Sequence, residues 1–198
     1  MRSVFVPALV AGLLAASPPA KADWAPVERI ETYPVAGATG IELYRSIGAN
    51  GPKIGPARVI AYTDFKLTWR RDYRPQSDGS CKLVAATPKL IITYRLPKPS
   101  GRLPTATRAR WRTFSEGIAA HEKVHGGFIV DMVRQIEALS IGFTHSDDPK
   151  CKRIYGELKK HLAALSQRQR ARSRDFDRDE MSDGGNVHRL VLALINGG

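Results

Sequence analysis

The hydrophobic positions in the second half of the chain have the spacing of long helices. Between Trp111 and Leu139, apolar residues recur at steps of three or four, as on one buried helical face. A second stretch with the same spacing follows after a short connection. We therefore expect one helix over residues 105–139 and another over residues 150–176, packed as antiparallel neighbours. The apolar positions of the first helix are Trp111, Phe114, Ile118, Phe128, Met132, Ile136 and Leu139.

The first half of the chain has the alternation and the turn signals of β-strands. The expected strands cover residues 27–35, residues 58–73 with a shift of facing near their end, and residues 81–96 with a bulge at Pro88. The turn signal at residues 76–79 predicts that the last two strands form an antiparallel hairpin.

These elements predict one α+β domain, in which a small antiparallel sheet is followed by two long antiparallel helices. A chain of 198 residues is long enough for one domain with a substantial core. The domain is expected to cover residues 23–198, with residues 23–97 mostly in strands and residues 105–180 mostly in helices. Residues 97–104 form a proline-rich hinge, and residues 38–47 are ambiguous between a loop and a short helix.

The first 22 residues have the composition of a cleaved secretory signal. Arg2 gives a positive start, an apolar run of 13 residues follows, and Ala20 and Ala22 are small residues at the positions that a signal peptidase reads. The apolar run is shorter than the about 20 residues that cross a bilayer, so we expect cleavage rather than anchoring. The mature protein is therefore predicted to be periplasmic or secreted, without a transmembrane segment.

The chain contains two cysteines, Cys81 and Cys151, which lie 70 positions apart. This spacing does not fit a compact metal-binding knuckle. In the oxidising compartment that export implies, a disulfide between the two halves is expected, and it would stabilise the fold by roughly 2–4 kcal/mol. Two buried free thiols are the alternative.

The chain is strongly basic, which bears on its partners. Its formal charge is +12, and this falls to +10 when the two cations Arg2 and Lys21 leave with the leader. The densest basic run, from Arg168 to Arg174, contains no aromatic residue and matches no nucleic-acid-binding motif. We therefore predict no nucleic-acid partner and interpret the run as a solvated helix face, able to contact an anionic envelope surface.

His121 and His125 fill a gap in the apolar face of the first predicted helix, and Glu122 lies beside them. Two imidazoles four residues apart on one helix face can bind one metal ion, and the glutamate is positioned to act on a bound water. A His-Glu-x-x-His pattern is expected about 0.005 times by chance in a chain of this composition. We predict a zinc site with His121 and His125 as ligands and Glu122 as general base. The alternative is two core histidines and a surface glutamate.

A catalytic zinc site needs a third protein ligand, and the motif leaves its identity open. Asp183 lies in an acidic turn after the second predicted helix, and His161 lies near the inner face of that helix. Counting the helical rise from the connection brings His161 to about the level of the motif. His145, Glu157 and His188 are further candidates.

Other positions that accompany the helix motif are the leader, Tyr33-Pro34-Val35, Gly37, Trp69, Cys81, Leu96-Pro97, Trp111, Phe114, Ile118, Cys151 and Phe176-Asp177. In this combination the chain resembles a bacterial family of predicted secreted zinc-dependent proteases, a domain of unknown function. The resemblance implies a zincin-like metallopeptidase with His121 and His125 as ligands and Glu122 as base. The family tends to carry a Thr-x-His-Gly element where this chain has Asp183-Gly184, so Asp183 replaces the histidine or a ligand is lost.

Two functions follow from these alternatives. The first is zinc-dependent hydrolysis of a peptide or protein substrate outside the cytoplasm, with His121, His125 and Asp183 as ligands. The second is a non-catalytic binding or scaffold protein of the cell envelope with a degenerate metal site. Metal content separates the two, because only the hydrolase requires a bound zinc ion.

Overall fold

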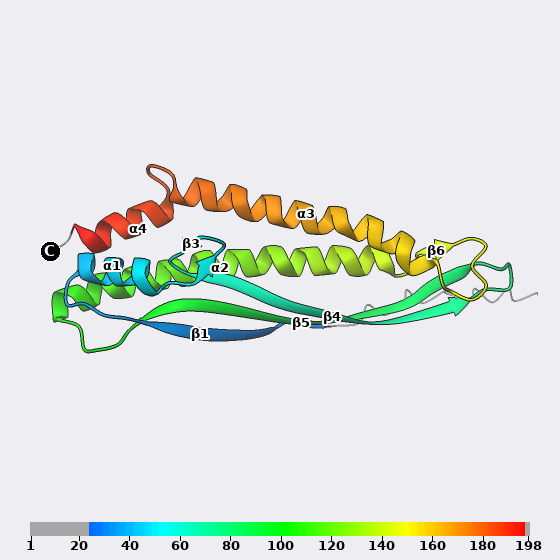
Figure 1. Cartoon of the computed structure of the whole chain (residues 1–198), viewed down its shortest axis with the longest axis horizontal. Helices are drawn as coiled ribbons and strands as arrows, with labels where there is room; N and C mark the ends of the chain where they lie inside the picture. The colour runs from blue at the N-terminus through cyan, green and yellow to red at the C-terminus, as the bar shows by residue number, and fades with distance from the viewer. Residues whose placement is uncertain (1–23, 197–198) are drawn as a thin grey trace, which may run out of the picture.

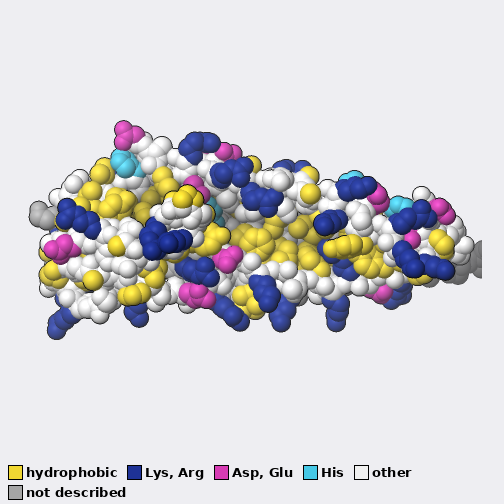
Figure 2. Space-filling model, in the orientation of Figure 1, with side chains coloured by type: hydrophobic (Ala, Val, Ile, Leu, Met, Phe, Trp, Pro, Cys, Tyr) yellow, Lys and Arg dark blue, Asp and Glu magenta, His cyan; other side chains and the backbone are white. Residues whose placement is uncertain are grey.

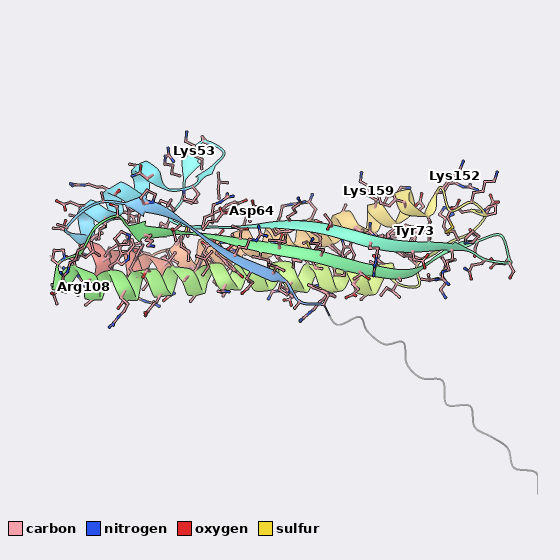
Figure 3. All side chains as sticks on the ribbon, turned by 90° about the horizontal axis from the view of Figure 1, so that it is seen from below. Lys53, Asp64, Tyr73, Arg108, Lys152 and Lys159 are labelled. Atoms are coloured by element: carbon pink, nitrogen blue, oxygen red, sulfur yellow. A yellow bond between two sulfur atoms is a disulfide. The ribbon has the colours of Figure 1, made fainter. Side chains whose placement is uncertain are left out.

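The computed structural model describes residues 24–196, which form the predicted α+β fold. In Figure 1, helix α2 (Thr105–Ser140) runs along the molecule between the sheet on one side and helix α3 (Ile154–Met181) on the other. Figure 3 shows from another direction that the long strands follow α2 over most of its length. The predicted leader, residues 1–22, lies outside the described residues.

The main sheet contains β1 (Val27–Val35), β5 (Cys81–Pro99) and β4 (Tyr62–Pro75) in that order, and the short β6 (Thr144–His145) also pairs with β5. The predicted antiparallel hairpin of β4 and β5 is confirmed. β1 pairs with β5 in parallel, however, so the sheet is mixed rather than wholly antiparallel as predicted. Alternation along a strand assigns side chains to faces, and it carries no information on the direction of the neighbouring strand.

The pairing of β4 with β5 is interrupted once, between Asp72 and Tyr73, which agrees with the predicted shift of facing near the end of this strand. The bulge predicted at Pro88 is wrong, because Pro88 pairs regularly with Trp69. The pairing with β1 begins only at Ile91, so at Pro88 one edge of β5 carries no strand among residues 24–196. A residue without a backbone N–H is tolerated at such an edge.

The two long helices confirm the prediction with shifted ends. Helix α3 begins at Ile154 rather than near residue 150 and continues to Met181. Asp147 and Cys151 have φ angles of 50° and 52°, so the backbone before Ile154 is left-handed at two positions and cannot be helical there. Within residues 24–196, no helix is both long and apolar enough to span a bilayer.

Two shorter helices lie together at one end of the molecule (Figure 1). Helix α1 (Gly40–Asn50) occupies the ambiguous segment of the sequence, and a capping box between Thr39 and Glu42 fixes its start. Helix α4 (Asn186–Ile195) is not predicted by the sequence pattern, because ten residues give too few periods. Near this end, β2 (Lys53–Ile54) and β3 (Ala57–Arg58) form a small separate hairpin.

Hydrophobic clusters lie in series along α2. One cluster, where α1 and α4 meet α2, includes Ile118, and the next, between α2 and β5, includes Ile129. His121 and His125 therefore lie on the α2 face between two packed clusters. Close packing on both sides restrains the position of this face, and with it the backbone that carries the two imidazoles.

The end of the molecule opposite α1 is closed by the predicted disulfide, Cys81–Cys151, which is confirmed. The bridge joins β5 to the segment before α3 and lies beside the fully buried Ile154. In the same segment, the buried carboxylate of Asp148 accepts hydrogen bonds of 2.8–2.9 Å from the backbone N–H groups of residues 152–154. These N–H groups have no partner within the helix, so Asp148 satisfies the start of α3.

Candidate metal centre

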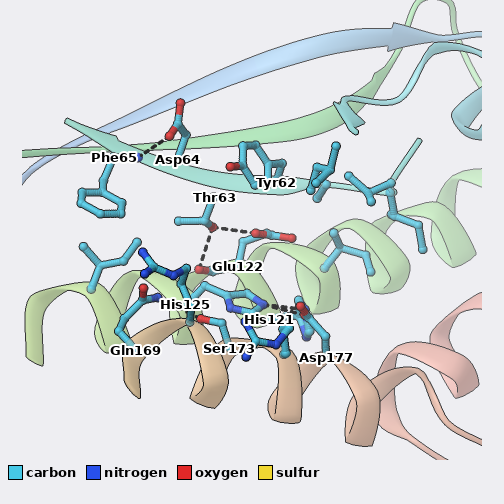
Figure 4. Close-up of a pocket in the computed structure, with 18 of the residues that line it drawn as sticks. Tyr62, Thr63, Asp64, Phe65, His121, Glu122, His125, Gln169, Ser173 and Asp177 are labelled. Carbon is cyan, nitrogen blue, oxygen red and sulfur yellow. Dashed lines mark hydrogen bonds and ion pairs between the residues drawn. The ribbon is translucent and has the colours of Figure 1, made fainter. Parts of the chain in front are cut away.

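His121 and His125 direct the same ring atom toward one point, as their spacing on α2 predicts. Their Nε2 atoms lie 3.1 Å apart. Asp177 of α3 approaches the same point, and its Oδ1 lies 3.2 Å from Nε2 of His121 and 2.8 Å from Nε2 of His125. Figure 4 shows the three side chains meeting between the two helices, and their ligand atoms all lie within 4.8 Å of one another.

This donor set fits a zinc ion. Two imidazole nitrogens and one carboxylate oxygen are common zinc ligands, and bonds of about 2.0–2.1 Å in a tetrahedron separate such ligand atoms by roughly 3.3 Å. The three observed separations of 2.8–3.2 Å are close to that value. Three protein ligands leave a fourth position for water or substrate, which is typical of catalytic rather than structural zinc sites.

Helix α3 also supports the ring of His121. Phe176 stacks on this imidazole with 4.8 Å between ring centroids and an interplanar angle of 19°. Nδ1 of His121 is buried without a hydrogen-bond partner among the described residues, and Oε2 of Glu180 lies 3.6 Å from it. Metal-binding imidazoles usually donate their other N–H to a carboxylate, so Glu180 is the residue that can complete this support.

Glu122 is buried beside the two histidines and faces β4 (Figure 4). The hydroxyl of Thr63 donates a hydrogen bond of 2.6 Å to Oε2 of Glu122 and lies 3.1 Å from the backbone carbonyl oxygen of the same residue. Burial raises the pKa of Glu122, although the Thr63 hydrogen bond and the neighbouring imidazoles oppose the rise. A raised carboxyl pKa favours proton transfer in both directions near neutral pH.

The grouped residues also affect one another's protonation. Burial lowers the pKa of His121, but the nearby carboxylates of Asp177 and Glu122 outweigh it, and the net pKa is raised. Burial raises the pKa of Asp177, but hydrogen bonds to the two histidines outweigh it and lower the pKa to about 2. Asp177 is therefore ionised at neutral pH, as a carboxylate ligand must be.

The glycine that follows the motif is explained by the approach of the sheet. A Cβ atom on Gly126 would lie 2.2 Å from the hydroxyl oxygen of Tyr94 on β5. Tyr94 is buried, and its hydroxyl donates a hydrogen bond of 2.7 Å to Glu28. The next residue, Gly127, has no heavy atom within 4 Å of such a Cβ. Gly126 thus lets α2 lie close to β5 directly after the second histidine.

The three converging side chains and Glu122 line a groove of about 440 Å³ between β4 and α3. Ile129 and Met132 of α2 contribute to its floor, and residues 62–65 of β4 form one wall. β4 is an outer strand of the sheet, so its second edge pairs with no strand among residues 24–196. Figure 2 shows hydrophobic side chains along the middle of one face of the molecule, with Lys and Arg side chains around them.

Asp183, the predicted third ligand, does not lie in the cluster. It follows the end of α3 at Met181, its side chain is fully exposed, and its Oδ1 lies 3.6 Å from Nδ1 of His188. The turn after α3 therefore carries both Asp183 and His188 away from the converging Nε2 atoms. Asp177, six residues earlier and still on the helix, occupies the position that the sequence analysis assigned to Asp183.

The remaining candidates also lie elsewhere. His161 packs against Phe143, with 5.6 Å between ring centroids, in the connection that follows α2. His145 lies in β6, and Glu157 is paired with Lys160 at 2.7 Å. The first turns of α3 thus lie beside the connection and not beside the motif, which is why counting from the connection suggests His161 wrongly as a neighbour of the motif.

Asp177 is the residue of the cluster that the sequence analysis does not name as a ligand. The signal that could have found it is the Phe176-Asp177 pair, which belongs to the residues that carry the family resemblance. In the structure, Phe176 packs against His121 while Asp177 meets both histidines.

A family model described as "Bacterial protein of unknown function (DUF922)" matches residues 30–185. This range includes the helix motif and Asp177, and it ends before α4. No curated protein and no solved structure matches the chain.

Proposed function

The chain belongs to this bacterial family, and we propose that it is a zinc-dependent hydrolase of peptide bonds. One observation carries the proposal: Nε2 of His121, Nε2 of His125 and Oδ1 of Asp177 converge beside the buried carboxylate of Glu122. The proposed zinc ligands are these two histidines and Asp177. The proposed general base is Glu122.

The roles of the side chains follow from their positions. When bound, zinc would act as a Lewis acid that polarises a substrate carbonyl and lowers the pKa of a water molecule. Thr63 holds Oε2 of Glu122, which leaves Oε1 to accept the proton of the attacking water and to deliver it to the leaving amine nitrogen. The raised pKa of Glu122 favours holding this proton between the two transfers.

A peptide is supported as the substrate by the edge of β4 that pairs with no strand in the described part of the chain. Residues 62–65 of this strand line the groove, and Asp177 and the preceding turns of α3 line it as well. An extended peptide can pair its backbone with such an edge and thereby bring one of its carbonyl groups to the site. Small-molecule substrates gain nothing from a strand edge, so the edge favours a polypeptide.

We further propose that the reaction takes place in the periplasm or outside the cell. The Cys81–Cys151 disulfide supports an oxidising compartment, because such bridges persist mainly in exported proteins. The signal-like composition of residues 1–22 points the same way.

Metal analysis and hydrolysis of a mixed peptide library test the proposal. Protein that begins at residue 23 should retain close to one zinc ion per chain and cleave peptides, and chelation should abolish cleavage until zinc is restored. His121→Ala should lose both properties, while Asp183→Asn, at an exposed position outside the cluster, should keep both. Folded protein that neither binds zinc nor cleaves peptides would overturn the proposal and favour a non-catalytic binding protein of the envelope.

A further inference from the structure

Two arginines of α3, Arg170 and Arg174, line the groove next to the candidate metal centre. Both are exposed, and neither has an ion pair or a side-chain hydrogen bond within residues 24–196. Arg172, which lies between them in sequence and is also exposed, does not line the groove and has partners. It donates a hydrogen bond of 3.0 Å to Asp131, and its guanidinium covers the ring of Phe128 at 3.9 Å. The two groove arginines are thus free to bind a ligand.

The α3 residues that line the groove form one face of the helix with a regular spacing. Its members recur at steps of three or four residues, so they share one face of the helix. At about 1.5 Å of rise per residue, Arg174 lies roughly 4.5 Å and Arg170 roughly 10.5 Å along the axis from Asp177. The members of this face are Ser166, Gln169, Arg170, Ser173, Arg174 and Asp177.

An extended peptide in the groove would pass both arginines close to the metal ligands. Such a peptide advances by about 3.3 Å per residue, so the two guanidinium groups lie about one to three residues from a bond held at Asp177. The opposite wall, formed by β4, is less favourable for an anion, because the charged side chain that lines the groove there is the carboxylate of Asp64. An acidic side chain of the peptide would therefore turn toward α3.

The rest of the groove is apolar. Ile129 and Met132 lie at its floor, and Ile54, Phe65 and Met181 line it although they are 37–49% exposed. Large hydrophobic side chains that remain exposed around one groove are typical of a binding surface for apolar groups. The groove thus combines an apolar surface with two arginines on one wall that form no ion pair with any described residue.

We infer that the substrate is an extended peptide with an acidic side chain one to three residues from the cleaved bond, bound by Arg170 and Arg174. A neighbouring apolar side chain of the peptide lies over Ile129 and Met132. Guanidinium groups suit this task because their planar donors match both oxygens of a carboxylate. The assignment of the cleaved bond rests on the proposed function, whereas the preference for an acidic peptide does not.

A binding measurement tests the preference without hydrolysis. Glu122→Gln protein, with no metal added, is incubated with two mixtures of peptides of equal length and apolar composition, one with a single Glu per peptide and one with Gln instead. The Glu peptides should be retained roughly threefold to tenfold better, as expected for partly exposed charge-assisted pairs. The preference should disappear when Arg170→Gln and Arg174→Gln are combined. It should persist when Lys159→Gln and Arg168→Gln are combined, which removes two positive charges from α3 outside the groove.

Cleavage by the unsubstituted protein supplies the second measurement. Mass spectrometry of the products should show Glu or Asp enriched within three residues of the cleaved bonds, and the two groove substitutions should remove the enrichment. Cleavage without any acidic preference, or equal retention of both peptide mixtures, overturns the inference while the proposed hydrolysis stands. Retained binding preference without cleavage supports the inference and counts against the proposed hydrolysis.

Discussion

At its first turn, α3 is attached to the rest of the molecule by the Cys81–Cys151 bridge and by the carboxylate of Asp148, which accepts three backbone hydrogen bonds. About six turns later, at Asp177, α3 meets α2 through side chains whose hydrogen-bonding groups are only partly satisfied by one another. There, two imidazole nitrogens and a carboxylate oxygen face one another, and Nδ1 of His121 is buried without a partner among the described residues.

The two attachments of α3 differ in how their buried polar groups are paired. Buried polar groups normally find partners, because an unpartnered group loses its hydration without compensation. At the disulfide end, the buried carboxylate of Asp148 follows this rule, because its three hydrogen bonds satisfy backbone N–H groups at the start of a helix. At the other end, buried titratable groups converge without completing one another, which is expected where a ligand or a reaction supplies what is missing.

The largest expected effect separates catalysis from folding at the metal centre. Glu122→Gln should lower kcat/KM for peptide cleavage roughly 10²- to 10⁴-fold, because it removes the proton acceptor. Zinc content and the thermal midpoint should stay close to those of the unsubstituted protein. Glu116→Gln, at an exposed position on the same helix, is the control and should leave cleavage unchanged. Full activity in Glu122→Gln would remove Glu122 from the mechanism.

The second prediction concerns the proposed zinc ion as a stabilising link between α2 and α3. Zinc at about 1,000 times its dissociation constant should raise the free energy of unfolding by about 4 kcal/mol, because it binds the folded chain. Asp177→Asn should lose most of this increase, whereas Asp183→Asn should keep it. Thermal unfolding with and without zinc measures both variants. A loss confined to Asp183→Asn would return the third ligand to the position predicted from the sequence.

The third prediction addresses the other end of α3. Replacing both cysteines by serine should lower the free energy of unfolding by roughly 2–4 kcal/mol, since the bridge closes a long loop of the unfolded chain. Zinc binding at temperatures where the variant is folded should not change, because the candidate metal centre is formed by residues outside the cluster that contains the disulfide. Denaturant unfolding and zinc titration check the two statements. If zinc affinity falls as well, the two ends of α3 are coupled.

A pair of glycines allows a smaller test of the α2 surface behind the metal ligands. Gly126→Ala should destabilise the protein by roughly 1–3 kcal/mol, because the added methyl group meets the hydroxyl of Tyr94. Gly127→Ala should stabilise it by roughly 0.5–1 kcal/mol, since alanine is the better helix former and the space is open. Opposite signs in denaturant unfolding are expected. Equal effects would contradict the close contact between α2 and β5.

The smallest expected effect is a pH dependence at the disulfide end. Burial raises the pKa of Asp148, but hydrogen bonds from three backbone N–H groups outweigh it, and the net pKa is lowered. A lowered pKa in the folded state means that the ionised carboxylate contributes stability above its ordinary pKa of about 3.9 and loses it as the pH falls through the folded value. The thermal midpoint of Asp148→Asn should therefore lie below that of the unsubstituted protein at pH 7 and approach it in acid. A gap independent of pH would contradict this assignment.

Much of the fold could be predicted because its signals are local. The hydrophobic period of residues 105–139 depends only on one helix face, and β1 has the predicted bounds of residues 27–35. The α2 part of the candidate site could be predicted for the same reason. Four residues make about one turn, so the convergence of His121 and His125 follows from the sequence alone.

The parts that the sequence does not reveal depend on how separate elements are aligned. Thirteen residues separate Ser140 from Ile154, and their sequence does not predict which turn of α3 lies beside the motif. In the structure, the start of α3 lies at the tip of the long hairpin, where the disulfide joins it to β5, and this position determines which turn of α3 faces the motif. Asp177 therefore reaches the histidines instead of His161 or Asp183. The parallel direction of β1 could not be predicted for a similar reason, because it depends on how β1 pairs with β5 and not on the sequence of β1 alone.

The placement of Asp177 also sets an order of assembly in time. His121 and His125 precede Asp177 by 56 and 52 residues, so a chain that emerges from a ribosome presents both histidines first. The cluster is complete only after the whole of α2, the connection and most of α3 have emerged. A growing chain therefore contains the helix motif before it contains the complete cluster.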